Sequence, residues 1–251
     1  MKRKLILTVL FCVTLCVPLS LFGQNRDFEM NGTVLVRYNG NAANVTIPAG
    51  VTAIGNRAFA DNQLISITIP NSVTSIEYRA FFRCTSLTSV IIPDGVTAIE
   101  NNTFTGCESI TSITIPSSVT FIGNYAFSGC TSLANISIPV SVISIGESAF
   151  GWCYNLTEIT IPTGVTSIAK KTFTRCRSLT SITIPINITF IGERAFEECN
   201  GLTSVTIPDS VNSIGEYAFT LCNNLKTVTV SRRTRIGVLA FPSNAQITYS
   251  D

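Results

Sequence analysis

The sequence predicts an α/β repeat solenoid of nine coils of about 23 residues, with a parallel β-sheet and short helical or 3-10 turns. Three recurring features predict this fold. An Ile-Pro pair recurs with one spacing of 22 residues and then six of 23, its prolines being Pro48, Pro70, Pro93, Pro116, Pro139, Pro162, Pro185 and Pro208. A phenylalanine recurs in the same register at Phe59, Phe81, Phe104, Phe127, Phe150, Phe173, Phe196, Phe219 and Phe241. A cysteine follows seven of these phenylalanines by three residues, at Cys84, Cys107, Cys130, Cys153, Cys176, Cys199 and Cys222.

The strand of each coil is predicted from the run L-T-S-I-T-I, whose last residues alternate between apolar and polar. Alternation with a period of two places the apolar residues on one buried face, and the β-branched residues favour extended backbone. Proline ends the strand because it has no N–H to donate. The following V-T-S-I is a second extended piece with valine and isoleucine pointing inward.

The last part of each coil, x-x-A-F-x-x-C, has a nearly helical spacing of its alanine, phenylalanine and cysteine. We therefore expect a helical or 3-10 turn with these three residues facing inward. A single coil buries too few apolar side chains to offset the entropy of ordering its backbone, so the coils are stable only when stacked.

The two ends of the chain depart from the repeat. Residues 1–23 resemble a secretory signal peptide, with Lys2, Arg3 and Lys4 before an apolar run and Gly23 before the expected cleavage point. A retained membrane anchor and a lipoprotein are the alternatives. Residues 24–44, with two Asn-Gly turns around the run 33–38, are predicted as an N-terminal β-cap.

The pattern L-x-x-I-x-I-P-x-x-V-x-x-I-G-x-x-A-F-x-x-C resembles the BspA-like, or treponemal-type, leucine-rich repeat. The resemblance covers residues 45–241, and we assign residues 45–251 to these repeats with an atypical last coil. It implies a leucine-rich-repeat rod or shallow horseshoe with a parallel sheet along one face. It also implies adhesion to extracellular-matrix proteins, host cells or other microbes from the cell surface.

Composition argues against catalysis and against nucleic acid as a partner. The sequence contains no histidine, which removes histidine-based triads, general acids and metal ligands. Without Lys2, Arg3 and Lys4 the chain carries 14 basic and 15 acidic residues, a net charge of −1 that selects neither nucleic acid nor an anionic membrane. We expect no cofactor, no metal and no membrane span after cleavage of the signal.

The seven repeated cysteines fit buried free thiols better than ligands or disulfides. One cysteine per coil forms a straight column, whereas zinc needs a tetrahedral cage. Disulfides between adjacent coils are geometrically possible, but seven is an odd number and small apolar thiols suit an inward column.

Exposed positions that interrupt the repeat are the candidate ligand-binding residues. Trp152 and Tyr154 flank one cysteine, and Arg175 and Arg177 occupy the same columns one coil later. Stacking would place Trp152 beside Arg175 and Tyr154 beside Arg177, where cation–π contacts could order them, with Glu198 next in the Trp152 column. The outward positions of the sheet are mostly serine and threonine, and one of them is an acidic residue. From this face we select Glu158, Thr160 and Thr183.

The sequence thus favours an exported binding protein at the cell surface, in the periplasm or secreted. Its expected partner is a protein, such as an extracellular-matrix or host-cell surface protein, which would make it an adhesin. A structural envelope spacer without a dedicated ligand is the alternative, and an enzyme is the least favoured class. The sequence does not indicate an oligomeric state.

Overall fold

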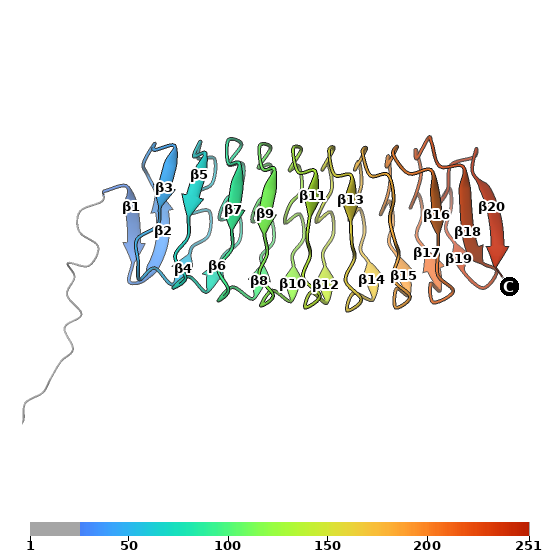
Figure 1. The fold of residues 1–251 in the computed structure, drawn as a ribbon, viewed down its shortest axis with the longest axis horizontal. Helices are drawn as coiled ribbons and strands as arrows, with labels where there is room; N and C mark the ends of the chain where they lie inside the picture. Colours follow the sequence, from blue (N-terminus) through green and yellow to red (C-terminus); the bar gives the residue numbers. More distant parts are fainter. Residues whose placement is uncertain (1–25, 251) are drawn as a thin grey trace, which may run out of the picture.

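The computed structural model describes residues 26–250, and the predicted signal peptide lies outside them. The backbone winds into an elongated rod whose coils lie side by side along its long axis (Figure 1). Strands of a first face are β3 (Asn44–Thr46), β5 (Ser66–Thr68), β7 (Ser89–Ile91), β9 (Ser112–Thr114), β11 (Asn135–Ile136), β13 (Glu158–Ile159), β16 (Ser204–Thr206), β18 (Thr227–Ser231) and β20 (Gln246–Ser250). Strands of a second face are β1 (Phe28–Asn31), β2 (Val34–Tyr38), β4 (Ala53–Ile54), β6 (Ser75–Ile76), β8 (Ala98–Ile99), β10 (Phe121–Ile122), β12 (Ser144–Ile145), β14 (Ser167–Ile168), β15 (Phe190–Ile191), β17 (Ser213–Ile214) and β19 (Arg235–Ile236).

Equivalent strands pair in parallel and in register with the neighbouring coil along most of the rod, and the pairing is interrupted between β6 and β8, between β9 and β11 and between β12 and β14. On the first face Val90 of β7 lies opposite Ile113 of β9, and on the second face Ile122 of β10 lies opposite Ile145 of β12. These inward side chains are all buried, whereas the residues before them in each strand are exposed. The predicted parallel solenoid, with its alternating inward pattern, is confirmed.

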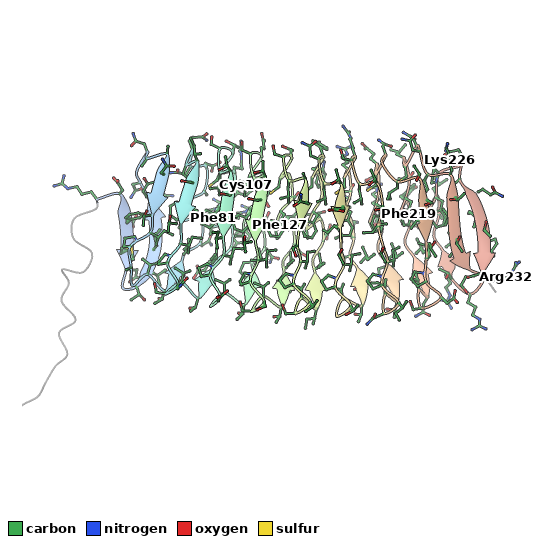
Figure 2. All side chains as sticks on the ribbon, in the orientation of Figure 1. Phe81, Cys107, Phe127, Phe219, Lys226 and Arg232 are labelled. Atoms are coloured by element: carbon green, nitrogen blue, oxygen red, sulfur yellow. The ribbon has the colours of Figure 1, made fainter. Side chains whose placement is uncertain are left out.

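A column of stacked phenylalanines runs through the core. From Phe59 to Phe241 the ring centroids of successive phenylalanines are 4.8–5.8 Å apart, and their planes are within 20° of parallel. The rings from Phe59 to Phe219 are at most 1% exposed. Figure 2 shows Phe81, Phe127 and Phe219 along the interior of the rod. Because aromatic rings stack well at this spacing, each phenylalanine holds its coil to both neighbours.

The prediction of helical turns is wrong, since residues 26–250 contain no helix and the α/β assignment does not hold. In the first complete turn, Arg57 and Asp61 have positive φ angles of 58° and 61°. Equivalent residues repeat this in every later coil except the last, where Leu239 alone has a positive φ. Left-handed residues four positions apart cannot continue a right-handed helix.

The backbone hydrogen bonds of the turn explain its conformation. The N–H of Phe59 donates to the carbonyl of Ala80 in the next coil at 2.8 Å, whereas the N–H of Ala58 donates within the turn to Gly55 at 3.1 Å. Alternate N–H groups therefore tie neighbouring coils together, in place of the bonds between residues i and i−4 that a helix requires. The turn segments form a third side of the coil, with a ladder of their own.

At the N-terminal end the repeat meets an antiparallel strand. β1 pairs antiparallel with β2, which in turn pairs parallel with β4. The Phe28 ring lies 5.1 Å from that of Tyr38, which lies 5.3 Å from Phe59 and so extends the aromatic column. The boundaries of the three segments assigned from the sequence stay predictions.

At the other end, β20 pairs only with β18. Figure 2 shows Lys226 and Arg232 at the surface near this end. The Arg232 guanidinium lies 5.3 Å from the Tyr249 ring centroid. Within residues 26–250, no helix is long and apolar enough to cross a membrane.

The seven cysteines of the repeat are buried and free, as predicted. Each thiol donates to the phenylalanine carbonyl of the preceding coil, as Cys107 does to Phe81 at 3.1 Å. Burial raises the pKa of Cys153 and of Cys222 to about 12, against which a hydrogen bond to the neighbouring cysteine backbone acts only weakly. The column of buried thiols therefore acts as packing, with one satisfied donor per coil.

We predict that Phe150→Ala destabilises the rod by about 3–5 kcal/mol, because it removes a fully buried ring from the middle of the column. Urea unfolding followed by circular dichroism would measure the change. Val140→Ala, at a side chain that is 85% exposed, is the control and should leave the midpoint almost unchanged. Equal midpoints for the two variants would contradict a stabilising role for the stack.

We also predict that the protein loses stability from pH 9 toward pH 12. Unfolded thiols ionise above their ordinary pKa of 9.0, whereas burial raises the pKa of the folded Cys153 and Cys222 thiols to about 12. A raised folded pKa means that the stabilisation is complete below pH 9 and falls as the pH rises, by about 1.4 kcal/mol per pH unit for each thiol. Melting temperatures measured from pH 8 to pH 11 would show the decline.

Cys153→Ala isolates the thiol contribution from that of lysines and tyrosines. The variant loses packing at every pH, but its stability should fall less steeply above pH 9 because one titrating group is gone. A slope identical to that of the unsubstituted protein would show that folding does not shift this pKa.

Candidate functional site

The seven predicted site residues fall on two different sides of the coils. Trp152, Tyr154, Arg175 and Arg177 belong to turn segments, whereas Glu158, Thr160 and Thr183 belong to the first strand face. Trp152, Tyr154 and Arg175 are half-buried, and the other four are exposed. Within residues 26–250, no hydrogen bond, ion pair or ring contact joins one group to the other.

Stacking of the coils brings the turn residues into register. The N–H of Trp152 donates to the carbonyl of Thr174 at 2.8 Å, and that of Arg175 to Glu197 at 2.7 Å. The guanidinium of Arg177 lies 5.0 Å from the Tyr154 ring centroid, which confirms the predicted cation–π pair.

Trp152 and Arg175 occupy equivalent positions in adjacent coils, as predicted, but the cation–π contact expected between them does not form. Among the cation–π contacts of residues 26–250, none joins these two side chains. Instead, Arg175 Nε donates to Glu198 Oε1 at 3.0 Å. A charge-assisted hydrogen bond to a carboxylate is directional and stronger than an exposed contact with an aromatic face, so the arginine turns toward the following coil.

Glu198 is the central residue of this group, although the sequence pattern did not select it. Its second oxygen accepts from Arg177 Nη2 at 2.9 Å, so one carboxylate bridges two arginines. Burial acts to raise the pKa of Glu198, but the hydrogen bonds and charges of Arg177 and Arg175 outweigh it and hold the pKa below its ordinary value. The carboxylate is 17% exposed and stays ionised at neutral pH.

The two arginines are 41% and 51% exposed, so each ion pair contributes only about 0–1 kcal/mol to stability. The main effect of the pairs is to fix the positions of the side chains. We call Tyr154, Arg175, Arg177 and Glu198, together with the adjacent Trp152, the turn patch. It presents two guanidinium groups and one carboxylate, and thus one net positive charge.

On the first strand face, Glu158 begins β13 and Thr160 forms an isolated bridge with Thr183. Within residues 26–250 the Glu158 carboxylate has no hydrogen bond or ion pair. These three residues line a hollow of about 570 Å³ that is also bordered by Asn135, Ile136, Ser137, Ile138, Ile159 and Ser181. The hollow is shallow and mostly polar.

A larger hollow of about 720 Å³ lies on the other side of the Ser181–Thr183 segment, and its only ionisable lining residue is Asp209. Asp209 is not among the predicted site residues, and nothing in the repeat distinguishes it from the other polar residues that follow a proline at that coil position. Neither hollow contains a histidine or a cysteine.

The described residues offer no arrangement suited to metal binding, since no group of three cysteine or acidic side chains converges within residues 26–250. The buried thiols have no access to a substrate. What the surface provides is a preorganised patch on the turn side and a hydroxyl-lined face on the strand side.

Comparison with known proteins places this geometry in a family. The BspA type leucine rich repeat region matches residues 37–156 and 143–250 in six copies. A leucine-rich repeat protein from Bacteroides ovatus is 27% identical, with a TM-score of 0.67 over 87% of this chain and 66% of that protein. A leucine rich cell surface protein from Faecalibacterium prausnitzii is 34% identical, with a TM-score of 0.53 over 74% of this chain and 59% of that protein.

A leucine rich repeat protein from T. pallidum is 30% identical, with a TM-score of 0.67 over 71% of this chain and 89% of that protein. The chain spans less than two thirds of the length of the Bacteroides and Faecalibacterium proteins. No match is found among curated proteins. The repeat matches extend from residue 37 to residue 250, over the same coils whose parallel strands are described above, and the chain belongs to the BspA type leucine-rich-repeat family.

Proposed function

We propose that the protein is an exported adhesin that binds extracellular-matrix or other surface proteins through exposed columns of its solenoid. The name of the Faecalibacterium relative, a cell surface protein, supports a surface location. The basic and apolar character of residues 1–23 supports export. The repeat supports a binding role because its inward residues build the scaffold and leave the outward positions free to contact a partner.

The turn patch is the observation that carries the proposal. Tyrosine, tryptophan and arginine contribute most of the binding energy at protein interfaces, and here they occur on adjacent coils. Glu198 holds Arg175 and Arg177 by hydrogen bonds of 3.0 and 2.9 Å before any partner arrives. Side chains that are already ordered lose less conformational entropy on binding, so the patch favours recognition of a protein surface.

We predict that Trp152→Ala combined with Arg175→Ala weakens adhesion at least tenfold, since loss of hot-spot side chains typically costs about 2 kcal/mol or more. Purified protein would be tested for saturable solid-phase binding to a panel of immobilised matrix and plasma proteins. Trp152 and Arg175 have φ angles of 59° and 61°. Alanine, like the residue it replaces, carries a Cβ atom, so the backbone strain of the turn is unchanged and the melting temperature should change little.

Arg83→Ala is the matched control, because Arg83 occupies the position of Arg175 in an earlier coil and has the same left-handed backbone. Its weak contact with Asp61, at 3.6 Å between exposed side chains, adds little stability. Equal binding by the double variant and the control would remove the turn patch from the interface. If no protein of the panel is bound, a structural envelope spacer is favoured, a role that the regular hydroxyl-lined face also suits.

A further inference from the structure

Strand pairing on the first face is interrupted at two places, between β9 and β11 and between residues 180–184 and 203–207. The second interruption borders the hollow of about 720 Å³. Within residues 26–250, no strand pairing or backbone hydrogen bond on this face joins residues 180–184 to residues 203–207. The same two coils remain paired on the second face, where Phe190 lies opposite Ser213, and in the turns, where Phe196 donates to Ala218 at 2.7 Å. The opening is therefore confined to the first face.

Gly201 marks the start of this opening. A Cβ atom at Gly201 would lie 2.5 Å from the carbonyl oxygen of Leu179, so the two backbones approach here more closely than a side chain would permit. Other coils carry serine or asparagine at this position, as at Ser178. The coils thus meet tightly just before the strand and part along it, which leaves Ile182 only partly buried.

The opening forms a continuous surface with the neighbouring hollow. The hollow of about 720 Å³ lies over the gap, and the hollow of about 570 Å³ lies on the other side of the same coil. Ser181 and Thr183 line both. We call the two hollows together the strand groove.

The charged side chains of the strand groove are all acidic. Its ionisable lining residues are Glu158 and Asp209, both acidic, and no aromatic ring lines it. Asp209 accepts one hydrogen bond, from Ser250 Oγ at 3.0 Å. Most other lining side chains are hydroxyls or isoleucines, among them Ile186, which is 82% exposed. A cationic partner meets complementary charge here, whereas an acidic one meets only repulsion.

We propose that the strand groove binds an extended, lysine- or arginine-bearing polypeptide segment of the partner. This inference rests on the proposed binding function and names the chemistry of the ligand on the strand side. Glu158 and Asp209 belong to coils that are two apart, about 10 Å along the rod, and Asp209 lies five residues further along its own coil, so the two carboxylates are separated diagonally by up to about 20 Å. Side chains on one face of an extended segment recur every ~6.7 Å, so basic residues four to six positions apart match this separation.

An extended polypeptide also fits the polar groups of the groove. The threonine and serine hydroxyls donate and accept hydrogen bonds, and a peptide backbone offers both kinds of partner along its length. Small-molecule pockets are lined mainly by apolar and aromatic side chains, which this open groove does not provide.

The test uses a fluorescein-labelled heptapeptide of alternating threonine and lysine, and the same peptide with glutamate in place of lysine. Fluorescence anisotropy with the purified protein should detect binding of the lysine peptide only. Glu158→Gln combined with Asp209→Asn should raise its Kd at least fivefold at low salt, and the difference should shrink at high salt because exposed charges are screened.

Asp94→Asn is the matched control, since Asp94 follows a proline at the same coil position as Asp209 but lies outside the strand groove. It should leave the Kd unchanged. No binding of the lysine peptide, equal binding of both peptides, or an equal loss in Asp94→Asn would overturn the proposal. Full competition by neutral dextran would overturn it in favour of a glycan site.

The panel of matrix and plasma proteins separates this inference from the proposed function. If a panel protein binds and the Glu158→Gln, Asp209→Asn variant binds it equally well while the lysine peptide fails, the groove proposal alone is wrong. If the panel is silent while the lysine peptide binds with the expected dependence on the two carboxylates, the groove proposal holds and adhesion to those proteins is wrong.

Discussion

Each residue of this rod stacks on its own equivalent in the next coil, and the phenylalanine column is where that constraint is strictest. The ring separations of 4.8–5.8 Å are close to the spacing of paired strands, so strands and rings keep one common register. Side chains that recur at one coil position lie next to each other, so they must pack without repulsion. Apolar rings, thiols and hydroxyls can do so. Charged side chains are instead stabilised by a neighbour of opposite charge, as Lys170 is by Glu193 and Arg175 by Glu198.

The same constraint explains which part of the fold was predictable from the sequence. Inward residues such as Val90 and Phe127 recur because burial selects them, and burial leaves a period that can be counted. The turns could not be predicted in this way. Their left-handed residues include Tyr125 and Trp152, side chains that disfavour positive φ, and only Gly106 and Gly129 at the equivalent position hint at it. The ladder between coils imposes this conformation, and such long-range bonds leave no local signal.

The candidate site was predictable to the extent that it follows the register. Adding one repeat to Tyr154 gives Arg177, and the structure places them together. The same arithmetic places Arg175 beside Trp152 and Glu198 next in that column, but it does not tell which neighbour the arginine contacts, and the structure shows that it is Glu198. The strand groove depends on the close approach at Gly201, which a single glycine in a serine position does not reveal.

A gap in one ladder does not unfold the rod, because two coils that are not bonded on one side are still joined on the other two. Between residues 180–184 and 203–207 the first face contributes no backbone bonds, yet β15 and β17 pair on the second face and Phe196 stacks 4.8 Å from Phe219. In a solenoid each coil contacts only the next, so the cost of the gap stays at one interface. The buried columns therefore keep the coils together even where the exposed residues or the strand pairing differ from the repeat. A partner can distinguish one coil from another only by these exposed differences.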